Sequence, residues 1–144
     1  MTSSSSSPYA GDISPAEAWA RLKADPKAQL VDVRTMAEWN FVGLPDLSSL
    51  GRQVHCIEWQ NFPTGARNPG FVVEAGQVLA DPKAPVMMLC RSGARSRAAA
   101  IALTEAGFAQ VFNIAGGFEG DADHDGHRGN TNGWKAEELP WRQG

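Results

Sequence analysis

The sequence predicts an α/β domain with a central, mostly parallel five-stranded sheet and helices on both of its faces. Helix and strand patterns alternate along the chain, an order typical of parallel strands joined by helical crossovers. The 144 residues are 42% hydrophobic, which is enough to bury one substantial core. Apolar runs are short, and the longest, residues 98–103, cannot span a membrane. We therefore expect one domain over residues 9–144.

Five segments carry helix signals. Residues 14–17 (SPAE) and 35–38 (TMAE) are capping boxes, in which the first side chain and the glutamate satisfy free backbone N–H groups. Pro15 also suits the first helical position. Asn68-Pro69 opens a further helix, and Gly107 closes an alanine-rich one. The predicted helices cover residues 14–24, 35–41, 68–81, 96–106 and 134–138.

Short apolar and β-branched runs predict the second to fifth strands of the sheet. These strands cover residues 29–33, 54–59, 85–89 and 110–114. Ligands of open parallel sheets bind at the carboxyl ends of the strands. Asp32, Arg34, Trp59 and Cys90 all lie at such ends, so we expect the first three to line a pocket beside Cys90. Asp32 and Arg34 are more often structural than catalytic in this setting.

Composition limits the partners. Residues 1–8 (MTSSSSSP) have neither basic residues nor an apolar core, which predicts a disordered tail and not a secretory signal. A net charge of -3 and a pI near 5.5 argue against nucleic acid. Two cysteines are typical of a cytoplasmic protein with free thiols. We expect no nucleic acid, no membrane, no cofactor and no metal.

The segment most informative about chemistry runs from Cys90 to Ser96 (CRSGARS), between a strand and a helix. Inward-pointing N–H groups and the positive end of the helix dipole favour a thiolate on Cys90, the predicted nucleophile. Nearby arginines add positive charge, and the planar fork of Arg95 suits the oxygens of thiosulfate. The remaining loop residues are expected to bind substrate: Arg91, Ser92, Gly93, Ala94, Arg95 and Ser96.

The spacing within this loop narrows the reaction. Four residues separate Cys90 from Arg95, one fewer than in cysteine phosphatases, so the loop should enclose one large atom and not a phosphate. At this length it resembles the rhodanese family of sulfurtransferases. The resemblance implies that Cys90 takes a sulfane sulfur from thiosulfate or a related donor as a persulfide. A thiol, cyanide or a protein acceptor would then receive the sulfur, with ping-pong kinetics.

Two further segments resemble rhodanese signatures, so that the likeness covers residues 14–140. One is residues 31–34 (VDVR) with Glu38-Trp39, although Leu44 stands where the family has a turn histidine. The other joins residues 116–118 (GGF) to residues 134–140, with a Gly- and Asp-rich insertion at 119–132 between them.

Two alternative functions stay open. One is a persulfide carrier or interaction module that serves a protein partner. The other is a cysteine phosphatase or arsenate reductase on a similar fold.

Several side chains receive individual expectations. Ser96 should cap its helix while Ser92 lines the loop, and Arg97 should be exposed. Arg34 and Glu38, four residues apart, should form an ion pair.

Cys56 should pack in the core, with a resolving thiol as its alternative role. Residues 121–126 (DADHDG) resemble half of a calcium loop, but Asn132 replaces the bidentate glutamate. A hydrated polar loop is therefore favoured there.

Overall fold

The computed structural model describes residues 8–60, 64, 66–79, 81–91, 93–122, 124–128 and 132–142. Of the predicted N-terminal tail, all but Pro8 lies outside these residues. The strands of the main sheet are β1 (Gly11–Ile13), β2 (Gln29–Asp32), β4 (His55–Cys56), β5 (Pro85–Leu89) and β6 (Gln110–Ile114). The helices are α1 (Pro15–Ala24), α2 (Met36–Phe41), α3 (Phe71–Val78) and α4 (Ala94–Glu105), with a 3-10 turn at Ser48–Leu50.

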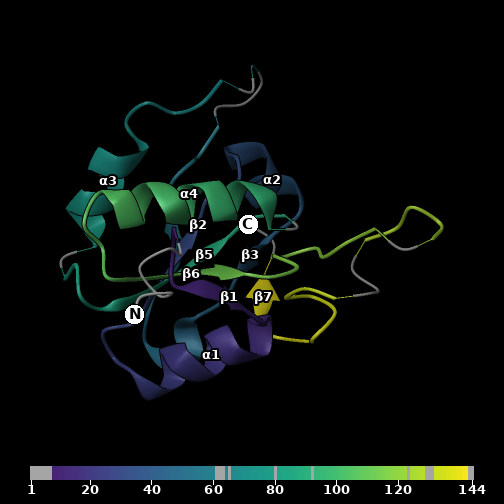
Figure 1. The fold of residues 1–144 in the computed structure, drawn as a ribbon. Coiled ribbons are helices and arrows are strands. Elements are labelled where there is room, and N and C mark those ends of the chain that lie inside the picture. Colours follow the sequence, from purple (N-terminus) through teal and green to yellow (C-terminus); the bar gives the residue numbers. More distant parts are fainter. Residues whose placement is uncertain are drawn as a thin grey trace.

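The five strands form one parallel sheet in the order β1-β6-β5-β2-β4. Helix α1 lies on one face of this sheet, and α3 and α4 lie on the other (Figure 1). Strand β5 is central and buried on both sides: Val86 and Met88 face the core beneath α4, while Met87 and Leu89 face the core beneath α1. The predicted α/β class, parallel sheet and helices on both faces are confirmed.

Local sequence signals place most helix ends. The Ser14 side chain caps α1, and both hydrogen bonds of the predicted capping box open α2. Helix α3 begins at Phe71, later than expected, because the Asn68 side chain accepts the Gly70 N–H and forms a turn first. Helix α4 begins at Ala94, two residues earlier than expected.

Two predicted elements are wrong. Residues 134–138 form a run of turns and not a helix, and Glu138 ends it in the left-handed region at φ 59°. The strand predicted over residues 54–59 shrinks to the two residues of β4 at the sheet edge. A small antiparallel sheet, which the sequence analysis did not predict, pairs β3 (Leu44–Pro45) with β7 (Trp141–Arg142).

The longest helix of the described chain, α4, has 12 residues. A helix that crosses a bilayer needs about 20 predominantly apolar residues. Over the residues that the structure describes, no helix meets the length and hydropathy required to span a membrane.

Candidate active site

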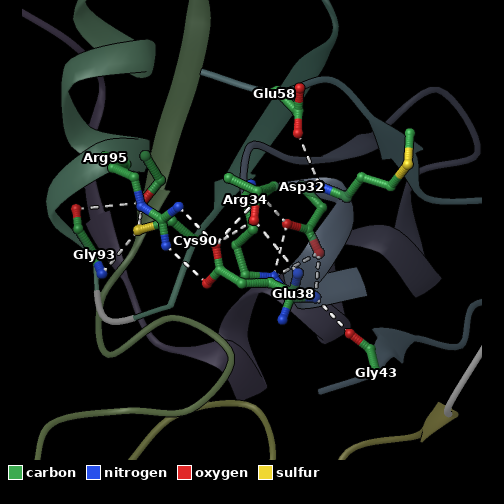
Figure 2. A network of polar contacts seen from close by, with 11 residues as sticks. Asp32, Arg34, Glu38, Gly43, Glu58, Cys90, Gly93 and Arg95 are labelled. Atoms are coloured by element: carbon green, nitrogen blue, oxygen red, sulfur yellow. Dashed lines mark hydrogen bonds and ion pairs between the residues drawn. The ribbon is translucent and has the colours of Figure 1, made fainter. Parts of the chain in front are cut away.

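Cys90 lies in the short connection between the central strand β5 and helix α4, and only 1% of its surface is exposed. The backbone N–H of Gly93 points at the sulfur and donates to Sγ across 3.1 Å (Figure 2). Gly93 has φ 119°, a backbone conformation that side-chain-bearing residues rarely adopt, and it immediately precedes α4. The sulfur therefore lies at the positive end of a 12-residue helix, where an anion is stabilised.

Ser96 is a second hydrogen-bonding group at the sulfur. Its fully buried Oγ lies 3.2 Å from Cys90 Sγ and 2.5 Å from Asn113 Oδ1. The Gly93 carbonyl also lies 3.2 Å from this oxygen, and a hydroxyl has one proton, so the Asn113 carbonyl, the Gly93 carbonyl and the sulfur compete for it. The prediction that Ser96 caps α4 is wrong, because the helix starts two residues before it and the preceding Gly93 makes no side-chain cap.

Asn113 is a residue that the sequence analysis missed. It lies on β6, and its Nδ2 donates to Asp12 Oδ1 at 3.1 Å, the same oxygen that accepts the Tyr9 hydroxyl at 2.8 Å. These bonds fix the amide so that its carbonyl faces Ser96. The sequence did offer one signal for this role, because Asn113 is the single polar residue in the apolar second half of its strand. A polar side chain buried at such a position requires a hydrogen-bond partner.

Arg95 is close enough to Cys90 for their charges to interact, but its guanidinium is bound to a carboxylate. Its Nη1 and Nη2 donate to the two oxygens of Glu38 at 2.7 and 2.9 Å (Figure 2). The Glu38 hydrogen bonds and the charge on Cys90 raise the pKa of Arg95, although burial opposes them. Burial by itself would raise the pKa of Glu38, but Arg95 outweighs it and holds that pKa below the usual range. A direct contact between Arg95 and a donor stays a prediction.

Arg34 forms a second, fully buried ion pair. Its Nη2 lies 2.7 Å from Asp32 Oδ2 and also donates to the Gly43 carbonyl at 2.6 Å. The Phe118 ring covers the guanidinium at 4.3 Å. The predicted ion pair between Arg34 and Glu38 is therefore wrong, because Arg34 pairs with the carboxylate of Asp32 and Glu38 pairs with Arg95.

The predicted pocket-lining residues do lie at neighbouring strand ends. The Val33 N–H donates to Leu89 O, and the Trp59 N–H donates to Val33 O. However, Asp32 and Arg34 are completely buried and Trp59 is 8% exposed. Their side chains form a packed layer beside Cys90, and the two charged ones do not face an open pocket.

A glycine pair holds the back of the cysteine loop. The Phe118 N–H donates to the Cys90 carbonyl at 2.8 Å, and the Glu119 N–H donates to the Arg91 carbonyl at 3.0 Å. This approach is possible only because Gly117 has no side chain: a Cβ there would lie 2.4 Å from the Cys90 oxygen. The GGF motif thus positions the loop that carries Cys90.

The other loop residues differ in exposure. Arg91 and Ala94 are exposed and Gly93 is buried, while Ser92 lies outside the described residues. Arg97 is exposed as predicted, 5.9 Å from the Tyr9 ring.

The expectation that Cys56 packs in the core is wrong, because the residue is exposed. Protein atoms around its thiol, together with the Asp32 charge, raise the pKa of Cys56 to about 12. Cys56 and Leu89 pair with Asp32 from opposite sides, which separates Cys56 from the cysteine loop by two strand spacings, about 10 Å. A disulfide needs Cα atoms within about 7 Å, so Cys56 cannot resolve a Cys90 persulfide without backbone movement.

The insertion projects away from the body of the domain (Figure 1). Asn132 closes its base, accepting from the Asp121 N–H at 2.8 Å and donating to the Asp121 carboxylate at 3.1 Å. Asp123 lies outside the described residues. Among the residues that are described, no three His, Cys, Asp or Glu side chains gather as metal ligands would.

A five-stranded parallel sheet with a cysteine loop between its central strand and a helix is the architecture of rhodanese-like domains. The crystal structure of a rhodanese-like domain protein from Staphylococcus aureus shares this fold, with a TM-score of 0.51 at 20% identity over 74% of this chain and 86% of that one. The model of the STR4 middle domain family matches residues 10–144, and the chain belongs to that family.

The chain is also similar to several other proteins. The crystal structure of Rv0390 from M. tuberculosis has a TM-score of 0.87 at 53% identity, covering 94% of this chain and 99% of that one. The solution structure of a polysulfide-sulfur transferase homodimer from Wolinella succinogenes has a TM-score of 0.64 at 25% identity, covering 92% of this chain and 78% of that one. The uncharacterized protein RP600 homolog of Rickettsia rickettsii is 34% identical over 91% of this chain and 96% of its own. Rhodanese-like domain-containing protein 4, chloroplastic, of Arabidopsis thaliana is 27% identical, and the match covers 86% of this chain and 24% of that protein.

Proposed function

We propose that this protein is a sulfurtransferase that carries a sulfane sulfur as a persulfide on Cys90. The observation that carries the proposal is the Gly93 N–H directed at a buried sulfur where α4 begins. Preorganised donors aimed at developing negative charge are the main catalytic device available to such a site. The similarity to a polysulfide-sulfur transferase supports the same reaction class.

In the first half-reaction the Cys90 thiolate attacks the outer sulfur of the donor. With thiosulfate, a bond forms between Sγ and that sulfur, and the bond to the sulfite sulfur breaks. Sulfite leaves with the electron pair and needs no proton, so no general base is required. The Gly93 N–H and the Ser96 hydroxyl remain beside Sγ during this step.

In the second half-reaction a nucleophile removes the outer sulfur and returns Cys90 to the thiolate. We propose a small-molecule donor, a thiol or cyanide as acceptor, and a protein thiol as the alternative acceptor. The proposed setting is the cytoplasm, where thiols are abundant.

The test is intact-mass analysis after brief treatment with thiosulfate or inorganic polysulfide. Wild type and Cys56→Ser should each gain the mass of one sulfur atom, and Cys90→Ser should gain none. Cyanide should remove the added mass. Loading of Cys90→Ser, or no loading of wild type by either donor, would overturn the proposal.

Turnover separates the remaining alternatives. Stoichiometric loading with slow release to small acceptors would indicate a persulfide carrier. Hydrolysis of p-nitrophenyl phosphate that depends on Cys90, without sulfur loading, would indicate a phosphatase.

A further inference from the structure

Two arginines of the candidate site, Arg95 and Arg34, are already neutralised by carboxylates. Arg95 meets Glu38 through two hydrogen bonds, and Arg34 meets Asp32. Building on the proposed function, we propose that Glu38 engages the guanidinium of Arg95, so that it cannot bind a donor, and thereby selects against dianionic sulfur donors. The favoured donors are then sulfane-sulfur compounds of low charge, such as hydropersulfides with an uncharged organic group.

The hold of Glu38 on Arg95 is preorganised. Glu38 is the third residue of α2, and its Oε1 also accepts the N–H and the hydroxyl of Thr35 at 3.2 Å each. The carboxylate is thus already aligned when it accepts both Arg95 nitrogens, and bidentate charge-assisted pairs are among the strong hydrogen bonds. A donor oxygen can use this fork only by displacing Glu38.

Arg34 offers no substitute cation. It is fully buried against the Phe118 ring, and Asp32 matches its charge through Nε and Nη2, although its buried Nη1 has no hydrogen-bond partner. Arg91 is exposed on the loop, where solvent and salt screen its charge. Arg95 is therefore the cation best placed to bind a donor at the sulfur among these three, and Glu38 controls its availability.

The charge balance follows from these pairs. Within the group formed by Cys90 and these two ion pairs, each arginine is matched by one carboxylate, so an ionised Cys90 leaves one net negative charge. Thiosulfate adds two more negative charges in a partly buried site, where repulsion is weakly screened. A hydropersulfide with an uncharged organic group adds at most one negative charge, and none while it is protonated.

The reaction with such a donor balances without any oxidant or reductant. The Cys90 thiolate attacks the outer sulfur of R–S–SH, forming the Sγ–S bond while the S–S bond between the outer and the inner sulfur breaks. The leaving RS⁻ takes the electron pair and accepts the proton of the outer sulfur. The products are the Cys90 persulfide anion and RSH.

Glu38→Gln tests the proposal with little change to the backbone. Glutamine retains the capping interaction with Thr35 but removes the charge. We compare Cys90 loading by thiosulfate and by the persulfide of 2-mercaptoethanol, using rapid-quench mass spectrometry. The kcat/KM for thiosulfate should rise at least about tenfold in Glu38→Gln, while that for the persulfide changes less than about threefold.

Glu17→Gln is the matched control. Glu17 is also the third residue of a capped helix and pairs with an arginine, Arg21, at 3.0 Å, but this pair is exposed on α1. Its donor preference should equal that of wild type. The two variants have the same net charge, so their ionic-strength profiles are directly comparable.

A double-mutant cycle tests whether Glu38 acts through the arginine. In an Arg95→Ala background, Glu38→Gln should raise thiosulfate loading by a smaller factor than in wild type, because only the charge of Glu38 is then removed and no guanidinium is released. An equal rise in both backgrounds, or an unchanged donor ratio in Glu38→Gln, would overturn the inference.

Wild type provides a measurement that does not depend on any variant folding. Added salt should speed its loading by thiosulfate, because salt screens the repulsion, and a slowing would contradict the inference. If wild type loads with neither donor, the proposed function fails; if it loads but the ratio does not move, only the inference fails.

Discussion

Gly117→Ala should displace the backbone of the cysteine loop, because Gly117 packs directly against the carbonyl groups of that loop. Gly117 has φ 60°, and a Cβ there would lie 2.4 Å from the Cys90 carbonyl oxygen and 2.7 Å from the Arg91 carbonyl carbon. Ordinary contact begins at 3.4 Å, so the two backbones must separate by about 1 Å. That movement breaks the 2.8 Å bond from Phe118 N–H to the Cys90 carbonyl.

Gly51→Ala isolates this effect. Gly51 has φ 69° and nothing within 4 Å of its added Cβ, so alanine there costs only the left-handed conformation, about 1–2 kcal/mol. Gly117→Ala adds one or two lost hydrogen bonds and local strain, about 2 kcal/mol more.

Urea denaturation measures both variants, and the rate of Cys90 loading reports loop geometry. We expect Gly117→Ala to be about 2 kcal/mol less stable than Gly51→Ala and slower to load. Free energies of unfolding within about 0.5 kcal/mol of each other would refute the close-approach argument.

Two further outcomes follow from the ion pairs. Arg34→Ala should lower the free energy of unfolding by about 3–5 kcal/mol, because it leaves the Asp32 carboxylate buried without a partner. A loss below about 1 kcal/mol in urea denaturation would show that this pair is dispensable. The pKa of Glu38 lies below its ordinary value of 4.5, so the folded state binds its proton less tightly than the unfolded state. The resulting stabilisation is present above that ordinary value and is lost as pH falls through the folded pKa. Stability measured from pH 6 downward should therefore fall more steeply in wild type than in Glu38→Gln, and parallel curves would contradict this.

The sequence predicted the elements whose signals are local. Two capping boxes placed the starts of α1 and α2, and an apolar run ending in Cys90 placed β5. Errors arose where the outcome depended on distant residues. Cys56 follows an apolar strand pattern, yet its strand lies at the sheet edge and the residue is exposed. Trp134 begins a helical pattern, yet its backbone N–H bonds to Gly117 and the segment remains a series of turns.

The spacing of charged residues along the sequence likewise did not predict which of them form ion pairs. Arg34 and Glu38 stand four residues apart, but that rule holds within one helix, and Arg34 precedes α2. Strand β2 instead presents Asp32 to Arg34, and Arg95 reaches Glu38 from 57 residues away.

The sequence alone was enough to predict the Cys90 loop and its place between a strand and a helix, because the strand, glycine and helix signals are contiguous around Cys90. Only the tertiary structure decided the electrostatics around it. Hydrogen bonds and ion pairs form between groups a few ångströms apart, and such distances are set by how the strands stack side by side and not by separation along the chain. Asn113 and Glu38 come from elements remote in sequence, and their contacts determine which proton and which guanidinium the sulfur meets.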